Sequence, residues 1–191
     1  MKKHWGVRLL VAAVLLALAC VGWKSAWRLY HQIGYPRRYE QQVSAASAEF
    51  GVPESLIYAI MKTESDFRPE AVSSDDACGL MQMLPDTLSW LQKLLPGERA
   101  YIREDLFKPE ISIRYGVFYL SWLQKRFFTD KTVAAAYHAG FGAVGKWLKN
   151  EQYSTDGVAL MQIPYADTAW YVEKVLYSKQ VYQNLYEKGR P

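Results

Sequence analysis

The chain opens with one continuous apolar segment. Residues 9–22 read Leu-Leu-Val-Ala-Ala-Val-Leu-Leu-Ala-Leu-Ala-Cys-Val-Gly and contain no charged side chain. Trp5 and Trp23 stand at its two sides and bracket about 19 residues, the length of a helix that spans a bilayer. The pattern therefore predicts an N-terminal membrane anchor or signal segment over residues 1–23.

From residue 39 onwards, apolar positions recur at the spacing of amphipathic helices. No alternating run between turn signals is present, so a large sheet is not expected. Helices bounded mainly by glycine and proline are predicted over 39–50, 53–64, 80–83, 85–95, 109–128, 130–139 and 164–186. Pro96-Gly97 is expected to end the fourth of these, and three glycines between 140 and 145 loosen the chain. We expect an all-α globular domain over residues 39–191, after a juxtamembrane linker at 24–38.

Charge divides the chain at the same place. Residues 1–39 carry seven of the 23 lysines and arginines and no acidic residue, which leaves 16 basic and 19 acidic side chains beyond them. A mildly acidic body lacks the basic surface that nucleic-acid binding requires. The basic N-terminus belongs instead to membrane targeting, and its charge predicts that it stays in the cytoplasm while the domain is exported.

Two alternatives to a retained single-pass anchor stay open at the sequence level. Ala17-Leu18-Ala19 has the small residues of a signal-peptidase site, which would give a secreted domain. Cys20 could be lipidated, although Ala-Leu-Ala-Cys is a poor lipoprotein signal. All three alternatives place the domain outside the cytoplasm.

The sequence predicts no metal site and no organic cofactor. Cys20 lies in the apolar segment and Cys78 in the body, so a disulfide between them is not expected. The three histidines are scattered, and no cysteine or histidine pair has the spacing of zinc ligands. Cys78 is interpreted as a small core side chain.

Glu64 is the most informative residue of the body. Ile57, Ile60, Met61 and Glu64 are spaced i, i+3, i+4 and i+7, so the apolar face of one helix carries this carboxyl towards the interior. Burial raises the pKa of a carboxyl, and a carboxylic acid that keeps its proton near neutral pH can protonate a leaving group. A solvated glutamate at a helix end is the alternative.

Four elements then follow in order across residues 43–186. The first reads Glu-Ser-Asp-Phe-Arg-Pro-Glu-Ala-Val-Ser-Ser-Asp-Asp-Ala-Cys-Gly-Leu-Met-Gln at 64–82, and Pro-Asp-Thr follows at 85–87. Residues 136–147 contain Ala-Tyr-His-Ala-Gly, and residues 163–175 contain Ile-Pro-Tyr-Ala-Asp-Thr and Tyr-Val. Together they resemble the Slt-type lytic transglycosylases, the goose-lysozyme-like members of glycoside hydrolase family 23.

Three positions depart from the family pattern. Asp76 stands where the family usually has glycine, His138 replaces an asparagine, and Asp167 replaces a glutamate. The asparagine lies in the sugar groove of the family. A histidine at this place can still hydrogen-bond to a hydroxyl or an acetamido group.

The resemblance implies a lysozyme-like fold and peptidoglycan glycan strands as substrate. It implies cleavage of the β-1,4 bond between N-acetylmuramic acid and N-acetylglucosamine, with 1,6-anhydromuramoyl ends as product. Glu64 would act as general acid and then base, with Tyr171 as its catalytic partner. The implied substrate-binding residues are Ser65, Gly79, Met81, Gln82, Tyr137 and His138.

Two other functions remain open from the residues. Asp66, Asp75 and Asp76 follow Glu64 closely, and a second carboxylate among them would make the protein a hydrolytic muramidase. A non-catalytic peptidoglycan-binding scaffold, held in a cell-envelope assembly with a partner of unknown identity, is the other function.

Overall fold

The structure is a computed structural model that describes residues 3–95 and 100–187 of the 191-residue chain. It divides into two compact units, one ending at Pro36 and the other beginning at Arg37. The second unit thus begins two residues before the expected start of the globular domain.

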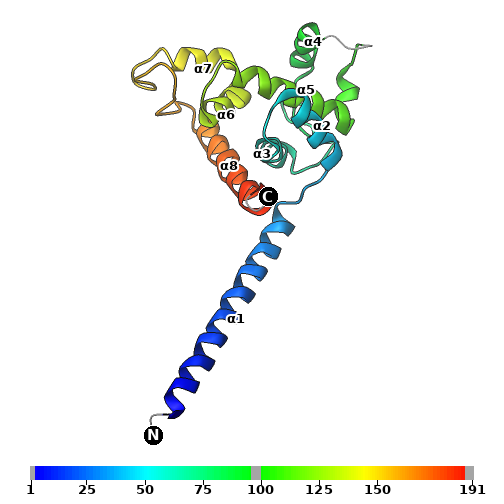
Figure 1. Ribbon diagram of the computed structural model, residues 1–191. Helices are drawn as coiled ribbons and strands as arrows, with labels where there is room; N and C mark the ends of the chain where they lie inside the picture. The colour runs from blue at the N-terminus through cyan, green and yellow to red at the C-terminus, as the bar shows by residue number, and fades with distance from the viewer. Residues whose placement is uncertain (1–2, 96–99, 188–191) are drawn as a thin grey trace. The chain divides into compact units, whose positions relative to one another are not determined.

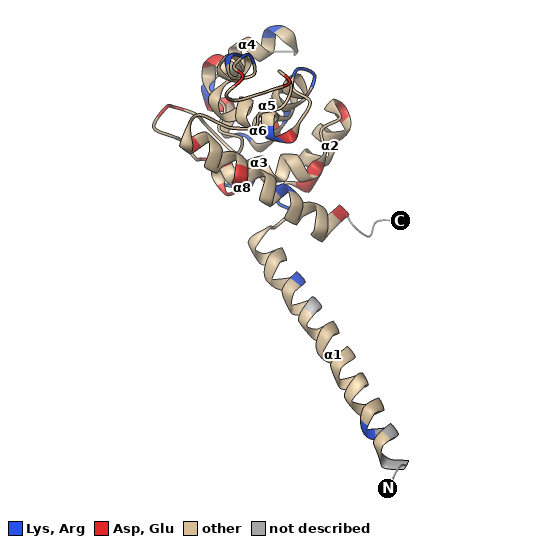
Figure 2. Ribbon diagram, turned by 90° about the vertical axis from the view of Figure 1, so that its left-hand side faces the viewer, with Lys and Arg blue, Asp and Glu red and all other residues tan. Residues whose placement is uncertain are grey.

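The first unit is a single long helix, α1 (Lys3–Gly34), drawn in blue in Figure 1. Among the described residues it is the one helix long and apolar enough to cross a membrane, over Arg8–Gly34. Figure 2 shows basic but no acidic positions along the described part of α1, whereas both kinds are spread over the second unit. The helix continues through most of the predicted linker, because no helix-breaking residue precedes Gly34 and Pro36.

The second unit is built from short helices, as predicted. In chain order they are α2 (Glu40–Phe50), α3 (Glu54–Ser65), α4 (Pro85–Leu94), the 3-10 helix η1 (Arg103–Phe107), α5 (Pro109–Gln124), α6 (Asp130–Ala139), α7 (Phe141–Trp147), α8 (Ala166–Tyr182) and the π-helical turn η2 (Gln183–Glu187). The described part of the chain contains no strand, only isolated bridges at Val72, Cys78 and Met83. The all-α prediction is confirmed.

Helix α3 forms the centre of this unit. Its residues from Ser55 to Met61 are all buried, and the helix packs against α2 and α8. A helix that is apolar on every side is stable only when neighbours cover it all round. Figure 1 shows α3 between α8 and α2, so the residue at its C-terminal end is carried into the interior of this unit.

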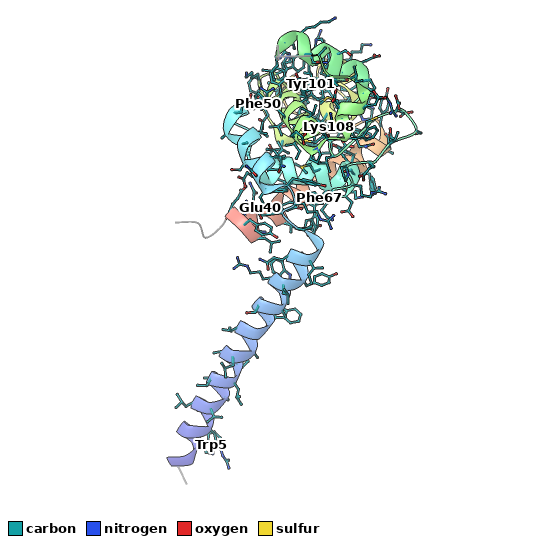
Figure 3. The ribbon with its side chains drawn as sticks, turned by 90° about the vertical axis from the view of Figure 1, so that its right-hand side faces the viewer. Trp5, Glu40, Phe50, Phe67, Tyr101 and Lys108 are labelled. Atoms are coloured by element: carbon teal, nitrogen blue, oxygen red, sulfur yellow. The ribbon has the colours of Figure 1, made fainter. Side chains whose placement is uncertain are left out.

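The end of α3 is a sharp reversal. Asp66 and Phe67 have φ angles of 49° and 62°, two consecutive left-handed residues that are not glycine. Phe67, labelled in Figure 3, is buried, and its ring centroid lies 6.4 Å from that of Tyr58. Packing of this ring offsets the backbone strain and fixes the direction in which the chain leaves Glu64.

Some predicted helix boundaries were wrong. Residues 79–82 form a tight turn rather than a helical piece, because the backbone groups of Cys78 and Met83 hydrogen-bond to each other across it. Helix α5 ends at Gln124 instead of 128, since Phe127 turns back into the core. The glycine-rich segment after residue 140 is the helix α7, and Pro96-Gly97 lies outside the described residues.

Candidate active site

One open cavity in the second unit has a volume of about 410 Å³. The end of α3, the loop that follows it, the start of α4, and the helices α5 and α6 all contribute to its wall. Its lining comprises Glu64, Ser73, Asp75, Ala77, Gln82, Met83, Leu84, Thr87, Tyr119, Tyr137, His138, Ala139 and Gly140.

Glu64 stands in the last turn of α3 and is half-buried at this cavity. The hydroxyl of Tyr171, from α8, donates a hydrogen bond of 2.7 Å to its Oε1 atom. Burial raises the pKa of Glu64 from 4.5 to about 7, while the hydrogen bond from Tyr171 acts in the opposite direction. The carboxyl therefore exchanges its proton near neutral pH, unlike a solvated glutamate at a helix end.

Two phenols lie near this carboxyl. Tyr171 is buried, and burial together with the charge of Glu64 holds its pKa well above the usual value. Burial and Glu64 raise the pKa of Tyr137 in the same way. Both groups therefore remain protonated hydrogen-bond donors wherever Glu64 titrates.

The turn at residues 79–82 connects three helices beneath the cavity. The hydroxyl of Ser65, at the end of α3, lies 2.9 Å from the carbonyl of Leu80. The amide of Met81 donates to Ser112 of α5 over 3.2 Å, and the hydroxyl of Tyr137, from α6, donates to the Met81 carbonyl over 2.8 Å. These bonds fix the turn against α3, α5 and α6.

Close packing explains the glycine and the methionine of this turn. Gly79 has a φ of +76°, and a Cβ atom there would lie 2.0 Å from the carbonyl oxygen of Leu106. Met81 is fully buried and packs against Gly116 of α5, where a Cβ atom would meet its sulfur at 2.7 Å. Only glycine fits at positions 79 and 116 without displacing Leu106 or the side chain of Met81, respectively.

Ser65, Gly79 and Met81 thus lie under the cavity and not on its lining, so direct substrate contact by these three residues finds no support. Gln82 does line the cavity. Its side-chain nitrogen donates to the carbonyls of Ala71 and Gly79, each over 3.0 Å. These two bonds fix the side-chain amide of Gln82, and the amide oxygen has no partner among the described residues.

His138 lines the cavity beside Tyr171. The two ring centroids are 4.4 Å apart, and Nδ1 of His138 lies 3.1 Å from the hydroxyl of Thr168. Burial lowers the pKa of His138 below its usual value, and the nearby charge of Asp167 opposes that shift. The structure therefore brings together Glu64, Tyr171, Tyr137, Gln82 and His138 of the residues named from the sequence.

The three aspartates after Glu64 occupy different surroundings. Asp66 is exposed beyond the end of α3, where it pairs with Lys62. Asp76 is bound by the guanidinium of Arg103, which lowers the pKa of that exposed carboxyl. Asp75 alone of the three lines the cavity.

Sequence reasoning missed Tyr119 as a lining residue and Thr168 as the partner of His138. Tyr119 lies on α5 among buried apolar residues, so its spacing resembles that of a core residue. Within residues 3–95 and 100–187, no three histidine, cysteine, aspartate or glutamate side chains are grouped so as to hold a metal ion.

The segment that forms this site is similar in sequence to known proteins. The family model described as the transglycosylase SLT domain matches residues 41–159. A putative soluble lytic murein transglycosylase of Haemophilus influenzae is 34% identical over 173 residues, which cover 87% of this chain and 28% of that relative. A membrane-bound lytic murein transglycosylase C of Photorhabdus laumondii is 40% identical over 116 residues, 56% of this chain and 32% of that relative. The chain therefore spans about a third or less of the length of these relatives.

Solved structures agree with the sequence comparison. An inactive mutant of the lytic transglycosylase Slt from Pseudomonas aeruginosa superposes with a TM-score of 0.72 and 28% identity, covering 84% of this chain and 26% of that one. The 70 kDa soluble lytic transglycosylase of Escherichia coli gives 0.72 and 27%, covering 81% and 25%. The helical fold, the cavity and the matched segment lead to one conclusion: this chain belongs to the SLT transglycosylase family.

Proposed function

We propose that this protein is a membrane-anchored lytic transglycosylase that cleaves the glycan strands of peptidoglycan. One observation carries the proposal. Glu64 is a half-buried carboxyl at the cavity, its pKa is raised to about 7, and Tyr171 orients it with a hydrogen bond of 2.7 Å. The names of the relatives, lytic murein transglycosylases, support the same activity.

In this mechanism, Glu64 first protonates the oxygen between N-acetylmuramic acid and N-acetylglucosamine. The bond to C1 of the muramoyl sugar breaks, and an oxocarbenium-like centre forms there. Glu64, now a carboxylate, takes the proton of the muramoyl 6-hydroxyl, whose oxygen attacks C1 and closes the 1,6-anhydro ring. A single group that donates and then accepts a proton works best with a pKa near the working pH.

A hydrolytic muramidase is the second candidate. It is favoured by one observation, the presence of Asp75 on the lining of the same cavity. Asp75 is exposed on a loop, in surroundings unlike the half-buried position of Glu64. Its position suits rim contact with substrate hydroxyls better than stabilisation of a cation at C1.

Helix α1 supports the membrane part of the proposal. It is exposed and apolar over Arg8–Gly34, and one relative is itself named membrane-bound. The basic residues before the apolar run favour a cytoplasmic N-terminus. The second unit would then face the cell wall.

The test is mass spectrometry of the soluble products released from purified peptidoglycan by the full chain in detergent micelles. We expect anhydromuramoyl ends from the parent protein and none from the Glu64→Gln variant. Reducing ends that incorporate solvent oxygen would replace the proposal with the muramidase. Release of no fragment by a folded parent that still binds peptidoglycan would favour the scaffold function.

A further inference from the structure

A row of aromatic rings leads away from the cavity. Tyr137 and Tyr119 both line it, and their ring centroids are 5.3 Å apart. From Tyr119 the row continues to Trp90 at 6.1 Å and to Trp122 at 6.2 Å. These two tryptophans are half-buried, so the row reaches the surface rather than ending in the core.

At the far end of this row three aromatic residues form a platform: Trp90 of α4, Trp122 of α5 and Phe141 of α7. Trp90 stacks on Phe141 with centroids 5.8 Å apart, and Trp122 meets Trp90 at 4.8 Å and Phe141 at 5.0 Å. Phe141 keeps 43% of its surface exposed. The platform adjoins the cavity, because the lining residues Thr87 and Gly140 precede Trp90 by one turn and Phe141 by one residue.

A guanidinium lies on this platform. The central carbon of the Arg126 guanidinium is 3.3 Å from the ring centroid of Trp122, and its Nη1 atom donates to the Trp122 carbonyl over 3.3 Å. The side chain is exposed. Most of its donors therefore remain available to a ligand.

Other arginines on aromatic rings differ from Arg126 in one respect. Three arginines that also lie on aromatic rings are each neutralised by a carboxylate of the protein, whereas Arg126 has no acidic partner within the described ranges. The neutralised pairs are Arg37 with Glu54, Arg103 with Asp76, and Arg114 with Glu49. An arginine held flat on a ring presents a preorganised fork that fits a carboxylate.

We propose that the platform of Trp90, Trp122 and Phe141, together with Arg126, is a further binding subsite for a carboxylate-bearing sugar of the strand in the cavity. The exposed aromatic surface takes the apolar face of the sugar ring, and Arg126 pairs with the carboxylate. The inference rests on the proposed function, since it assumes that a glycan strand occupies the cavity. It assigns to this chain a preference for charged over neutral glycan.

The carboxylate has two possible sources in peptidoglycan. The lactyl group of a muramoyl sugar carries a free carboxylate when the peptide has been removed. When the stem peptide is present, that carboxyl is an amide and the peptide supplies its own carboxylates. Three soluble ligands therefore distinguish the two sources from each other and from simple ring stacking. They are strands with peptides, strands stripped of peptides, and neutral N-acetylglucosamine oligomers.

The experiment uses the full chain in detergent micelles. KM is measured on both kinds of strand, and the inhibition constant is measured for the neutral oligomer as a competitor. Arg126→Ala should raise KM about 3-fold on at least one kind of strand, as loss of an exposed ion pair does. Arg126→Glu should raise it about tenfold, because like charges then face each other. Neither change should alter the inhibition constant of the neutral oligomer, and both effects should shrink at high salt.

Control variants separate charge, stacking and fold. Lys174→Ala removes a cation that lies 3.9 Å from the ring of exposed Trp170, a similar pair whose residues do not line the cavity, and should leave KM unchanged. Phe141→Ala should weaken the binding of all three ligands by roughly 5-fold, since it removes stacking surface. Glu64→Gln should abolish cleavage of both strands without weakening their binding.

The outcomes discriminate clearly. An effect on peptide-bearing strands alone assigns Arg126 to the stem peptide, and an effect on stripped strands assigns it to the lactyl group. An unchanged KM for Arg126→Glu on both strands, or an equal loss on the neutral oligomer, would overturn the subsite. Activity of Glu64→Gln close to that of the parent would overturn the proposed function instead, which is a separate result.

Discussion

Two carboxyl groups line the same cavity, and they differ in almost everything else. Glu64 ends the central helix α3, is half-buried, and receives a hydrogen bond from the buried Tyr171. Asp75 lies on an exposed loop, where its own backbone amide donates to the hydroxyl of Ser73 over 3.2 Å. The contrast teaches that burial, and not mere presence in the cavity, raises the pKa of Glu64 to about 7.

The largest expected effect sharpens this contrast directly. Glu64→Gln should lower the cleavage rate by about 10³-fold, because in the proposed mechanism it removes the acid that protonates the leaving group. Asp75→Asn should change the rate less than about 2-fold, as is usual for an exposed polar replacement. Rates are measured as release of soluble fragments, with thermal melts to show that both variants are folded.

The same two variants can also contradict this contrast between Glu64 and Asp75. A loss in Asp75→Asn as large as that in Glu64→Gln would show that the cavity uses two carboxylates. The hydrolytic muramidase would then replace the single-acid mechanism.

The next effect concerns stability. The pKa of Glu64 is raised from 4.5 to about 7 in the folded state, so the folded state holds this proton more tightly than the unfolded chain does. The resulting stabilisation is complete below pH 4.5 and is lost as the pH rises to about 7. Across that window, unfolding should become easier in the parent than in Glu64→Gln, with a difference of about 3 kcal/mol at pH 8.

Denaturant titrations of both proteins at pH 4 and pH 8 measure this difference. Glu64→Gln should gain stability relative to the parent at pH 8 and not at pH 4. A pH-independent difference between the two proteins would mean that Glu64 is solvated, and the contrast with Asp75 would disappear.

The smallest effect tests the hydrogen bond from Tyr171. Tyr171→Phe removes the bond that favours the carboxylate, so the pKa of Glu64 should rise further. Activity requires the protonated acid, and the alkaline limb of the pH–rate profile should therefore move to higher pH. We also expect roughly a tenfold lower maximal rate, since the acid loses its orientation. An alkaline limb that moves to lower pH would contradict the assigned role of this bond.

The sequence predicted the class of the fold and the position of its central acid. The spacing of Ile57, Ile60 and Met61 correctly indicated that α3 is buried and that it carries Glu64 inwards. Local patterns succeed here because one helix contains all the relevant information. The division into two units after Pro36 lies close to the change in charge that follows the apolar segment.

Side-chain roles within the motif could not be derived in this way. Gly79 is required because the carbonyl of Leu106 approaches it, and Met81 depends on the gap left by Gly116. Both partners are distant in sequence and carry no local signal. A motif therefore indicates which residues belong to a site, but not whether they line its cavity or pack behind the residues that do.

The hydrogen bond between Glu64 and Tyr171 also has a consequence for the order in which the protein becomes active. It joins residues 107 positions apart, and Tyr171 belongs to α8, the last α-helix of the described residues. Helix α8 is also a principal cover of α3, so Glu64 is neither desolvated nor oriented until α8 docks. In a chain synthesised from its N-terminus, Glu64 is therefore made well before α8, and the proposed acid can be oriented only after α8 has been synthesised and has docked.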